Sequence, residues 1–286
     1  MVLTPENATK LSPIFEGKRG KLLLKLGLKI TGIGHVNELH QHVEDLGIEP
    51  GPDFAKGILD DIQVDFRIGN AQRLQQLPEG PFIAIANHIY GHLDGIALVD
   101  ILGHARPKIK VMVNEFLMWI WGLAPNFIPV SPLTNASSGT TAASINGVKS
   151  ALLQLKAGEP LAIFPSGAVA DLQPRKGWIL DERDWQDAAI RIIRKARVPI
   201  VPIRFFDRNS RFYYGLGLLD YRIRFARLFH ELFNKKGTHP RMGIGETITV
   251  EQQDAVSDDQ FKAFLRASVY DMPLPETFTL RSELWK

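Results

Sequence analysis

A histidine and an aspartate six residues apart are the side chains of this sequence best suited to proton transfer. They are His88 and Asp94, in the segment Asn-His-Ile-Tyr-Gly-His-Leu-Asp-Gly at 87–95. An imidazole can act as a general base near neutral pH, and a carboxylate can orient it. On one continuous helix, six residues turn through about 600°, which leaves the two side chains about 120° apart. The pair can therefore meet only if the chain turns between them, and Gly91 allows such a turn.

Two other interpretations of this segment stay open on local grounds. Asp94 precedes Gly-Ile-Ala at the expected start of a helix, and an N-cap aspartate needs no catalytic role. His88 and His92 have the four-residue spacing of two metal ligands on a helix, with Asp94 as a third ligand. Gly91 between them and the lack of an H-E-x-x-H pattern make the metal site the weaker idea. Taken alone, the segment favours a structural role over a catalytic one.

The sequence around this pair alternates between strand and helix patterns after Asp60. Apolar runs predict strands at 62–68, 82–86, 109–113, 127–130, 161–164 and 200–204, and helical spacing predicts helices at 95–103, 115–123, 141–156 and 185–196. This alternation predicts an α/β fold with a mostly parallel central sheet flanked by helices. Ligands of such sheets bind beyond the carboxyl ends of the strands, which is where the histidine segment falls.

The N-terminal part of the chain differs in character from the rest. Residues 18–30 interleave five Lys and Arg with leucines, a pattern typical of a basic amphipathic helix. We expect residues 1–60 to form an N-terminal helical, membrane-associating segment and residues 61–286 to form the α/β domain. Residues 221–236 also combine cations with large apolar side chains. The alternative for both stretches is a surface helix that buries its apolar face in the core.

Composition excludes several classes of protein and site. The 286 residues include no cysteine, which rules out disulfides, thiolate metal sites and cysteine nucleophiles. The first ten residues lack the apolar region of an export signal. The most apolar stretches, 22–33 and 116–124, are shorter than the roughly 18 residues that span a bilayer. The formal net charge is +3. We expect a cytoplasmic protein that is peripheral on the inner face of the cell membrane. Among its partners we expect an anionic membrane surface and no nucleic acid.

Four sequence blocks in a fixed order point to a family. They are Asn-His with its downstream Asp, Ile-Pro-Val at 128–130, Phe-Pro-Ser-Gly at 164–167 and Val-Pro-Ile-Val-Pro at 198–202. In this order they resemble the glycerolipid acyltransferase superfamily. Three further details resemble its hemolysin-like branch, which includes makers of N-acyl amino acid lipids such as ornithine and glycine lipids. These details are the five residues between His and Asp, Arg-Asn-Ser at 208–210 and His-Glu-Leu-Phe-Asn-Lys at 230–235. The resemblance runs from about Phe66 to Thr249.

The resemblance implies acyl transfer from a thioester, on acyl carrier protein or coenzyme A, without a cofactor or a bound metal. His88 is then the general base, and Asp94 fixes its tautomer and stabilises the imidazolium. Main-chain N–H groups of 166–168 are candidates for stabilising the oxyanion. Residues of the blocks and nearby cations are expected to bind substrate: Asn87, Phe164, Pro165, Ser166, Gly167, Arg175, Lys176 and Arg208. One of the cations, Arg204 included, would hold an acceptor carboxylate; the alternative for Arg175 and Lys176 is a solvated loop.

Two departures from the family pattern bear on the acceptor. Ala168 stands where the branch usually has Glu. Ser166 stands where the branch that acylates lysophosphatidate has Glu, and the second block continues Ser-Pro-Leu at 131–133, without that branch's basic residue. We therefore predict acylation of the amine of a small amino acid of the glycine or ornithine type. A 1-acylglycerol-3-phosphate O-acyltransferase, acting on a lysolipid, and a catalytically weak membrane-binding scaffold remain as alternatives.

Overall fold

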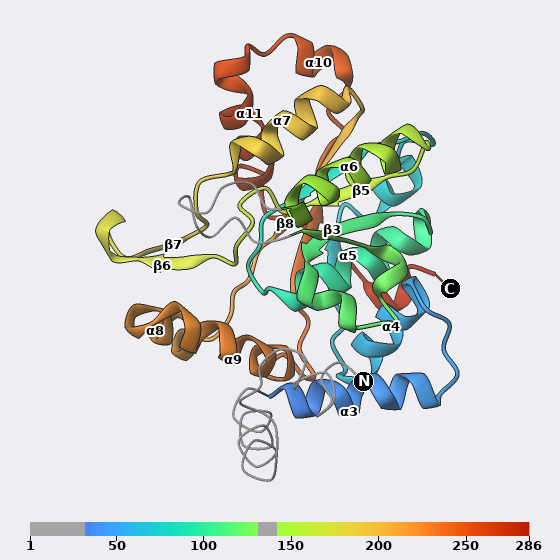
Figure 1. The fold of residues 1–286 in the computed structure, drawn as a ribbon, viewed down its shortest axis with the longest axis vertical. Helices are drawn as coiled ribbons and strands as arrows, with labels where there is room; N and C mark the ends of the chain where they lie inside the picture. The colour runs from blue at the N-terminus through green and yellow to red at the C-terminus, as the bar shows by residue number, and fades with distance from the viewer. Residues whose placement is uncertain (1–31, 131–141, 286) are drawn as a thin grey trace.

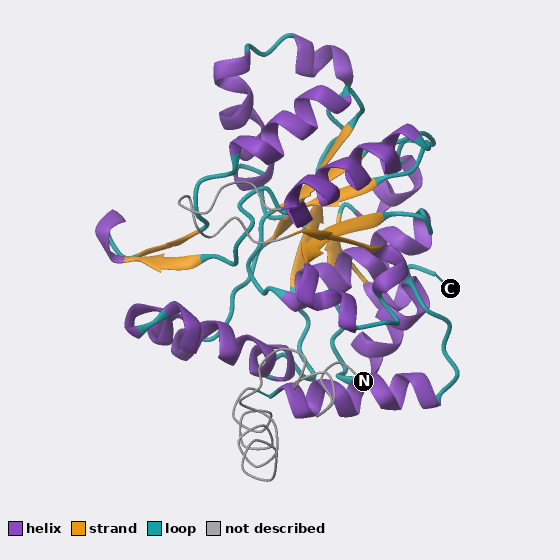
Figure 2. Cartoon of the chain, in the orientation of Figure 1, coloured by secondary structure: helices purple, strands orange, loops and turns teal. Residues whose placement is uncertain are grey.

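The computed structural model describes residues 32–130 and 142–285, which form an α/β fold (Figure 1). A sheet runs through the centre, and helices pack on both of its faces (Figure 2). The predicted fold class is therefore confirmed. Residues 18–30, for which the sequence predicts a basic amphipathic helix, lie outside the described residues.

The described strands of the central sheet are mostly parallel. They are β1 (Arg67–Gly69), β2 (Ile83–Ala86), β3 (Lys110–Asn114), β4 (Phe127–Val130), β5 (Leu161–Ile163), β8 (Ile200–Phe205), β9 (Arg241–Ile244) and β10 (Phe278–Leu280). Their order in space is β10-β1-β9-β8-β2-β5-β3-β4. From β8 to β4 every neighbouring pair is parallel. The antiparallel pairs are β8 with β9 and β1 with β10. The carboxyl ends of β2, β5 and β8 therefore lie at one edge, as the sequence predicted.

Both faces of this sheet are buried under helices. The described helices are α3 (Ile33–Asp45), α4 (Pro52–Asp61), α5 (His92–Ala105), α6 (Ala142–Lys156), α7 (Asp187–Ala196), α8 (Arg211–Leu219), α9 (Tyr221–Phe233), α10 (Val250–Asp254) and α11 (Asp258–Tyr270). Strand β2 shows why its sequence is uniformly apolar. Ala84 and Ala86 belong to one core cluster with α4 and α5, whereas Ile83 and Ile85 belong to another with α6, α7 and α11. A strand covered on both faces needs apolar residues at every position.

Two of the predicted elements differ from the observed ones. The alternating residues of 62–68 are buried as expected, but only β1 pairs as a strand, because the main chain before it bonds to loops such as Thr238. The helix predicted at 115–123 is wrong. That segment forms a 3₁₀ turn, η3 (Glu115–Trp119), followed by η4 (Ala124–Asn126). Gly122 packs against the ring of Phe54, where a Cβ atom would come within 2.5 Å of the ring. The close approach brings the chain back to begin β4 beside β3.

Helices α3 and α4 pack on the α/β domain. Val36 and Leu39 of α3 and Phe54 and Leu59 of α4 are buried in the same core cluster as α5. The described part of the predicted 1–60 segment thus shares its core with the domain, and the division at residue 60 stays a prediction. Among the described residues, no helix combines the length and the apolar character that a membrane span requires.

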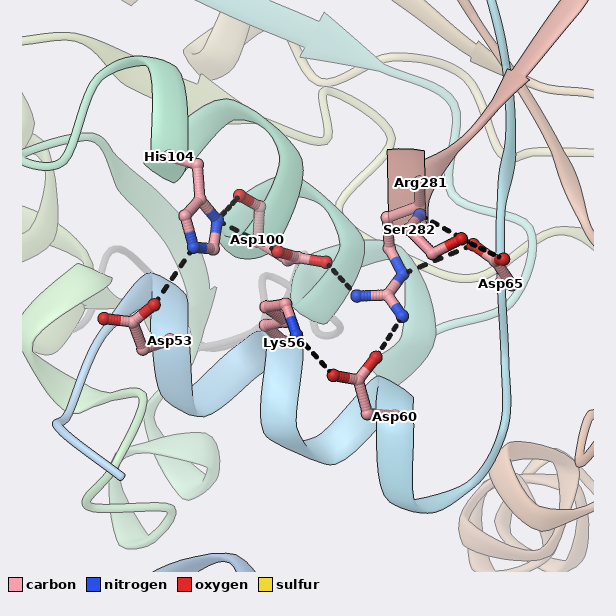
Figure 3. A network of polar contacts seen from close by, with 8 residues as sticks. All are labelled: Asp53, Lys56, Asp60, Asp65, Asp100, His104, Arg281 and Ser282. Carbon is pink, nitrogen blue, oxygen red and sulfur yellow. Dashed lines mark hydrogen bonds and ion pairs between the residues drawn. The ribbon is translucent and has the colours of Figure 1, made fainter. Parts of the chain in front are cut away.

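A buried arginine fastens the C-terminal residues to α4 and α5 (Figure 3). Arg281 donates from Nη1 to Asp100 Oδ2 at 3.1 Å and from Nη2 to Asp60, and its Nε lies 3.8 Å from Asp65. Asp100 also faces His104, whose Nδ1 lies 3.0 Å from Oδ1. Hydrogen bonding to Asp100 raises the pKa of His104 to about 9. At neutral pH two cations therefore balance the buried Asp100 carboxylate.

We expect Arg281→Met to lower the free energy of unfolding by about 3–5 kcal/mol, because it leaves a buried carboxylate without its main partner. Urea denaturation of the full chain measures the loss. Lys262→Met is the matched control, since it breaks an exposed ion pair with Asp187 and should leave the unfolding midpoint nearly unchanged. Equal midpoints for the two variants would show that this network does not anchor the C-terminus.

Candidate functional site

The ends of β2 and β8 are held together by an asparagine side chain. Asn87, the first residue after β2, donates from Nδ2 to the carbonyl oxygen of Phe205 at 2.9 Å and accepts from the Phe205 N–H at 2.7 Å. Both polar ends of this buried amide are therefore bonded to the last residue of β8. Asn87 positions the loop that carries His88, and a contact between Asn87 and substrate stays a prediction.

His88 and Asp94 meet because the chain reverses between them. Gly91 has a φ of 85°, and a Cβ atom there would lie 2.8 Å from the Leu228 side chain. Helix α5 begins one residue later, which places Asp94 in its first turn. The His88 Nδ1 atom then lies 2.9 Å from Asp94 Oδ2. The turn that the spacing required is thus present at the predicted glycine.

The Asp94 carboxylate is fully buried and serves two structural purposes at once. Its Oδ2 atom accepts from the main-chain N–H groups of Tyr90 at 2.9 Å and Gly91 at 3.0 Å, as well as facing His88. Burial raises the pKa of Asp94, and the hydrogen bond from His88 opposes that shift. The interpretation of Asp94 as the N-cap residue is wrong in position, because α5 begins at His92 with Gly91 as its N-cap. As the third residue of the helix, Asp94 caps it by accepting from the Gly91 N–H, and the same oxygen faces His88.

The His88 ring stacks on another ring with one face, and one of its two nitrogens is free of hydrogen bonds to the described residues. It stacks on the Phe164 ring with centroids 4.3 Å apart, and its side chain is 18% exposed. With Nδ1 on Asp94, the Nε2 atom makes no hydrogen bond to any residue that the structure describes. If Nδ1 carries the proton, Nε2 is an available base.

The arrangement does not favour a metal site on the two histidines. The His92 ring stacks on Phe229, with centroids 4.4 Å apart, and burial lowers the pKa of His92 to about 4. Within residues 32–130 and 142–285, no group of three His, Asp or Glu side chains is placed to hold a metal ion.

The loop after β5 supplies main-chain N–H groups beside this histidine. The N–H of Gly167 donates to the carbonyl oxygen of Phe164 at 2.9 Å, so it closes a turn and is not open for an oxyanion. That part of the predicted set is wrong. The N–H groups of Ser166 and Ala168 make no hydrogen bond to the described residues. Pro165 is buried and accepts from the Gln186 N–H at 2.8 Å, which makes it part of the loop's support.

Glu182, which the sequence analysis did not single out, is a buried residue whose carboxylate bonds to several segments around the site. Its Oε1 atom accepts from the main-chain N–H of His88 and lies 2.9 Å from Ser166 Oγ. Its Oε2 atom accepts from Trp185 Nε1 at 3.1 Å and from the Tyr270 hydroxyl at 2.6 Å. One carboxylate thus links the loop after β2 to the loop after β5. The run Asp-Glu-Arg-Asp at 181–184 resembles a solvated loop, and it contains no local signal of this role.

The predicted cations are spread over different places. Arg175 and Lys176 are exposed in the outer turn of the hairpin of β6 (Asp171–Gln173) and β7 (Ile179–Asp181), which extends away from the sheet in Figure 1. Arg204 donates to the carbonyl oxygens of Tyr270 and Met272, so it is a structural residue.

Arg208 lies nearer the histidine loop than the hairpin cations. It is exposed and precedes Asn209, whose Nδ2 donates to the carbonyl oxygen of Ile89 at 3.1 Å. The next residue, Ser210, is held by Glu231 through its N–H at 2.9 Å and its hydroxyl at 2.7 Å. The Arg-Asn-Ser segment and the α9 glutamate of the sequence resemblance therefore meet. Together they brace the loop that follows His88.

The family model and the two sequence relatives agree on one chemistry, acyl transfer. A family model described as Acyltransferase matches residues 39–273. The chain is 24% identical over 248 residues to a lyso-glycine lipid O-acyltransferase of Bacteroides thetaiotaomicron, covering 84% of this chain and 87% of that protein. It is 26% identical over 266 residues to a protein of the same name from Phocaeicola vulgatus, covering 90% and 91%. A crystal structure of the 1-acyl-sn-glycerophosphate acyltransferase PlsC from Thermotoga maritima matches with a TM-score of 0.46 and 14% identity, covering 76% of this chain and 79% of that one.

We expect Glu182→Gln to lower the free energy of unfolding by about 2–4 kcal/mol, because an amide nitrogen would face donors that now meet a carboxylate oxygen. Urea denaturation is the measurement. Glu246→Gln, which removes the charge of an exposed side chain paired with Arg73, should change the midpoint little. If Glu182→Gln is as stable as that control, the four contacts are not a support of the site.

Proposed function

The chain belongs to the acyltransferase family, as the match over residues 39–273 shows, and we propose that it transfers a fatty acyl group from a thioester to the hydroxyl of a lyso amino-acid lipid. The observation that carries the proposal is the His88–Asp94 pair, 2.9 Å apart at the carboxyl edge of the sheet with Nε2 open. The acceptor class is supported by the two bacterial relatives, both named for O-acylation of a lyso-glycine lipid.

In the proposed reaction the acceptor hydroxyl donates its hydrogen bond to His88 Nε2. Its oxygen attacks the thioester carbonyl carbon while the proton passes to Nε2, and the buried Asp94 carboxylate stabilises the imidazolium. In this proposal the N–H groups of Ser166 and Ala168, on the neighbouring loop, stabilise the oxyanion. The carbon–sulfur bond then breaks, and the departing thiolate takes the proton from Nε2. The products are an ester and a free thiol.

The surroundings of the pair support substrate binding by the neighbouring loops. Phe164 covers one face of the imidazole, and Ser166 and Gly167 shape the turn beside it. Exposed Arg208 follows β8 at the same edge of the sheet. We propose that this edge receives the thioester of acyl carrier protein or coenzyme A and that the chain works as a peripheral protein on the inner face of the cell membrane.

The choice between a hydroxyl and an amine acceptor rests on the relatives. The sequence resemblance predicted the amine of a small amino acid, and that prediction stays untested. A hydroxyl also needs a base, because an alcohol becomes a strong nucleophile only as its proton leaves. Residue Ala168, which suggested a weak scaffold, does not disturb the His88–Asp94 pair. Lysophosphatidate remains an acceptor to test.

We expect the purified full chain to convert lyso-glycine lipid and a long-chain acyl thioester into a lipid heavier by one fatty acid less water. Mass spectrometry identifies this ester, and mild alkaline hydrolysis should release the added acyl chain. Parallel reactions with free glycine and with lysophosphatidate test the amine and the glycerol phosphate. His88→Ala should lose the product, whereas His239→Ala, which changes an exposed histidine bonded only to the Asp65 carbonyl oxygen, should keep it. An alkali-stable amide, phosphatidate, or no product from any acceptor would each contradict the proposal.

We also expect Asp94→Asn to lower turnover by about 10²- to 10⁴-fold, because an amide cannot stabilise the imidazolium as a carboxylate does. An asparagine oxygen can still accept from the Tyr90 and Gly91 N–H groups, so the variant should remain folded, which thermal unfolding checks. Near-normal turnover of a folded Asp94→Asn variant would leave Asp94 as a helix cap alone.

A further inference from the structure

Large apolar side chains are exposed together on one part of the molecule. Seven of the thirteen exposed large hydrophobic residues in the described chain come from the β6–β7 hairpin, α8 and the start of α9: Trp178, Ile179, Phe212, Leu218, Leu219, Ile223 and Phe225. We call this set the hairpin–α8 surface. Figure 1 shows the hairpin and α8 extending side by side from the sheet, and α8 packs against β6. Such a concentration of exposed apolar side chains is typical of a surface that contacts a partner.

The hairpin–α8 surface stands on a firmly packed base. Arg224 of α9 is buried and donates to the carbonyl oxygen of Ala170 at 2.9 Å, and it also pairs with Asp171 of β6. The same guanidinium lies over the ring of Tyr213, which is itself buried in α8. The hairpin, α8 and α9 are therefore tied to one another. The elements that carry the exposed side chains are therefore fixed relative to one another by these contacts.

Trp178 is displayed at a backbone position that suits glycine better. Its φ is 62°, in the left-handed region that a bulky side chain rarely adopts, and the residue is 65% exposed. A tryptophan held in that conformation and left in water contributes little to folding. Leu219, the last residue of α8, has a side chain that is 77% exposed. Both residues fit contact with something outside the chain.

Exposed cations lie beside several of these apolar side chains, although residues 171–184 themselves contain three Lys and Arg against four Asp and Glu. Residues 207–236 contain seven Lys and Arg against three Asp and Glu, although the whole chain has a formal net charge of only +3. Arg175 and Lys176 are exposed in the hairpin turn beside Trp178. A recess of about 580 Å³ lies between the hairpin and α8, and its lining includes two cations, Lys176 and Arg183, and two aspartates, Asp171 and Asp184. Apolar side chains among cations match the boundary of an anionic bilayer.

The surface is continuous with the candidate site. Ala170, the residue before β6, donates its N–H to the His88 carbonyl oxygen at 2.8 Å. The base of the hairpin thus begins at the catalytic loop. The hairpin therefore connects the exposed side chains at its outer turn to the histidine loop at its base.

We propose that the hairpin–α8 surface docks on an anionic lipid bilayer, with Trp178 and Leu219 entering the headgroup boundary and the neighbouring cations facing anionic headgroups. This inference rests on the proposed function in that the acceptor and the product are lipids. It assigns membrane contact to β6–β7 and α8 rather than to residues 18–30. An acidic carrier protein would match the cations but not an apolar set of this extent.

The chain contains no cysteine, so single cysteines can report on membrane contact residue by residue. Leu219→Cys carries an environment-sensitive fluorophore, and Leu153→Cys on α6, where the leucine is 54% exposed, is the matched control. On vesicles of phosphatidylcholine with phosphatidylglycerol, emission from position 219 should rise and shift to shorter wavelength, and emission from position 153 should stay as in water. The readout is local, so binding by another segment cannot imitate it.

A second pair of variants measures how much the surface contributes to binding. Trp178→Gly together with Leu219→Ser should weaken sedimentation with these vesicles by about tenfold or more, because two apolar contacts are lost. Thermal stability should be kept, since glycine suits the backbone at 178. Leu153→Ser should bind like the unaltered chain, and vesicles of phosphatidylcholine alone should bind the unaltered chain more weakly.

Two results would overturn the inference. One is a protein that sediments with anionic vesicles while the fluorophore at position 219 stays in water. The other is a double variant that binds vesicles normally but needs a higher concentration of acyl carrier protein thioester, which would make the surface a docking site for that protein. Vesicle binding is measured without turnover. A failed product assay therefore contradicts the proposed acceptor and leaves this inference to its own test.

Discussion

A single buried carboxylate determines how the chain passes from the sheet into the first helix of the site. Asp94 has no exposed surface, and its Oδ2 atom faces His88 Nδ1 and two main-chain N–H groups. In a low-dielectric interior a carboxylate without donors would be costly, so the turn at Gly91 and the start of α5 are constrained to supply donors to Oδ2, whereas Oδ1 has no hydrogen-bond partner among the described residues. The same constraint orients the imidazole. Structural and chemical roles here are two consequences of one hydrogen-bond requirement.

The loops at the carboxyl edge of the sheet are joined by further buried polar side chains. Asn87 links the ends of β2 and β8, Glu182 links the loops after β2 and β5, and Glu231 of α9 holds the loop after β8 through Ser210. Each of these groups is buried and bonded to main-chain atoms of a loop or, for Asn87, of a strand end. Loops held in this way keep the imidazole, the main-chain N–H groups and the Phe164 ring in a fixed relation, which an acyl transfer site requires.

Glu182 also bears on the departure at Ala168. The related sequences of this branch usually carry a glutamate after the glycine of the third block, and this chain lacks it. A carboxylate nevertheless reaches the same loop from the residue that follows β7, where it meets Ser166 Oγ at 2.9 Å. The two ends of the hairpin therefore differ. Its base brings Glu182 to the site, and its outer turn displays Trp178 among cations.

Local patterns in the sequence determined the alternation of strands and helices, the parallel sheet and the pairing of His88 with Asp94. Each of these follows from the spacing of apolar residues or from a short turn, which neighbouring residues decide. The tertiary structure decided what depends on distant partners. Glu182 meets His88 across 94 positions, and Asn87 meets Phe205 across 118. It also separated Arg175 and Lys176 from the histidine, and it replaced the helix expected at 115–123 by a 3₁₀ turn followed by the close packing of Gly122 on Phe54. A buried polar group requires a partner, but its own sequence neighbourhood does not say which distant segment the fold will bring to it.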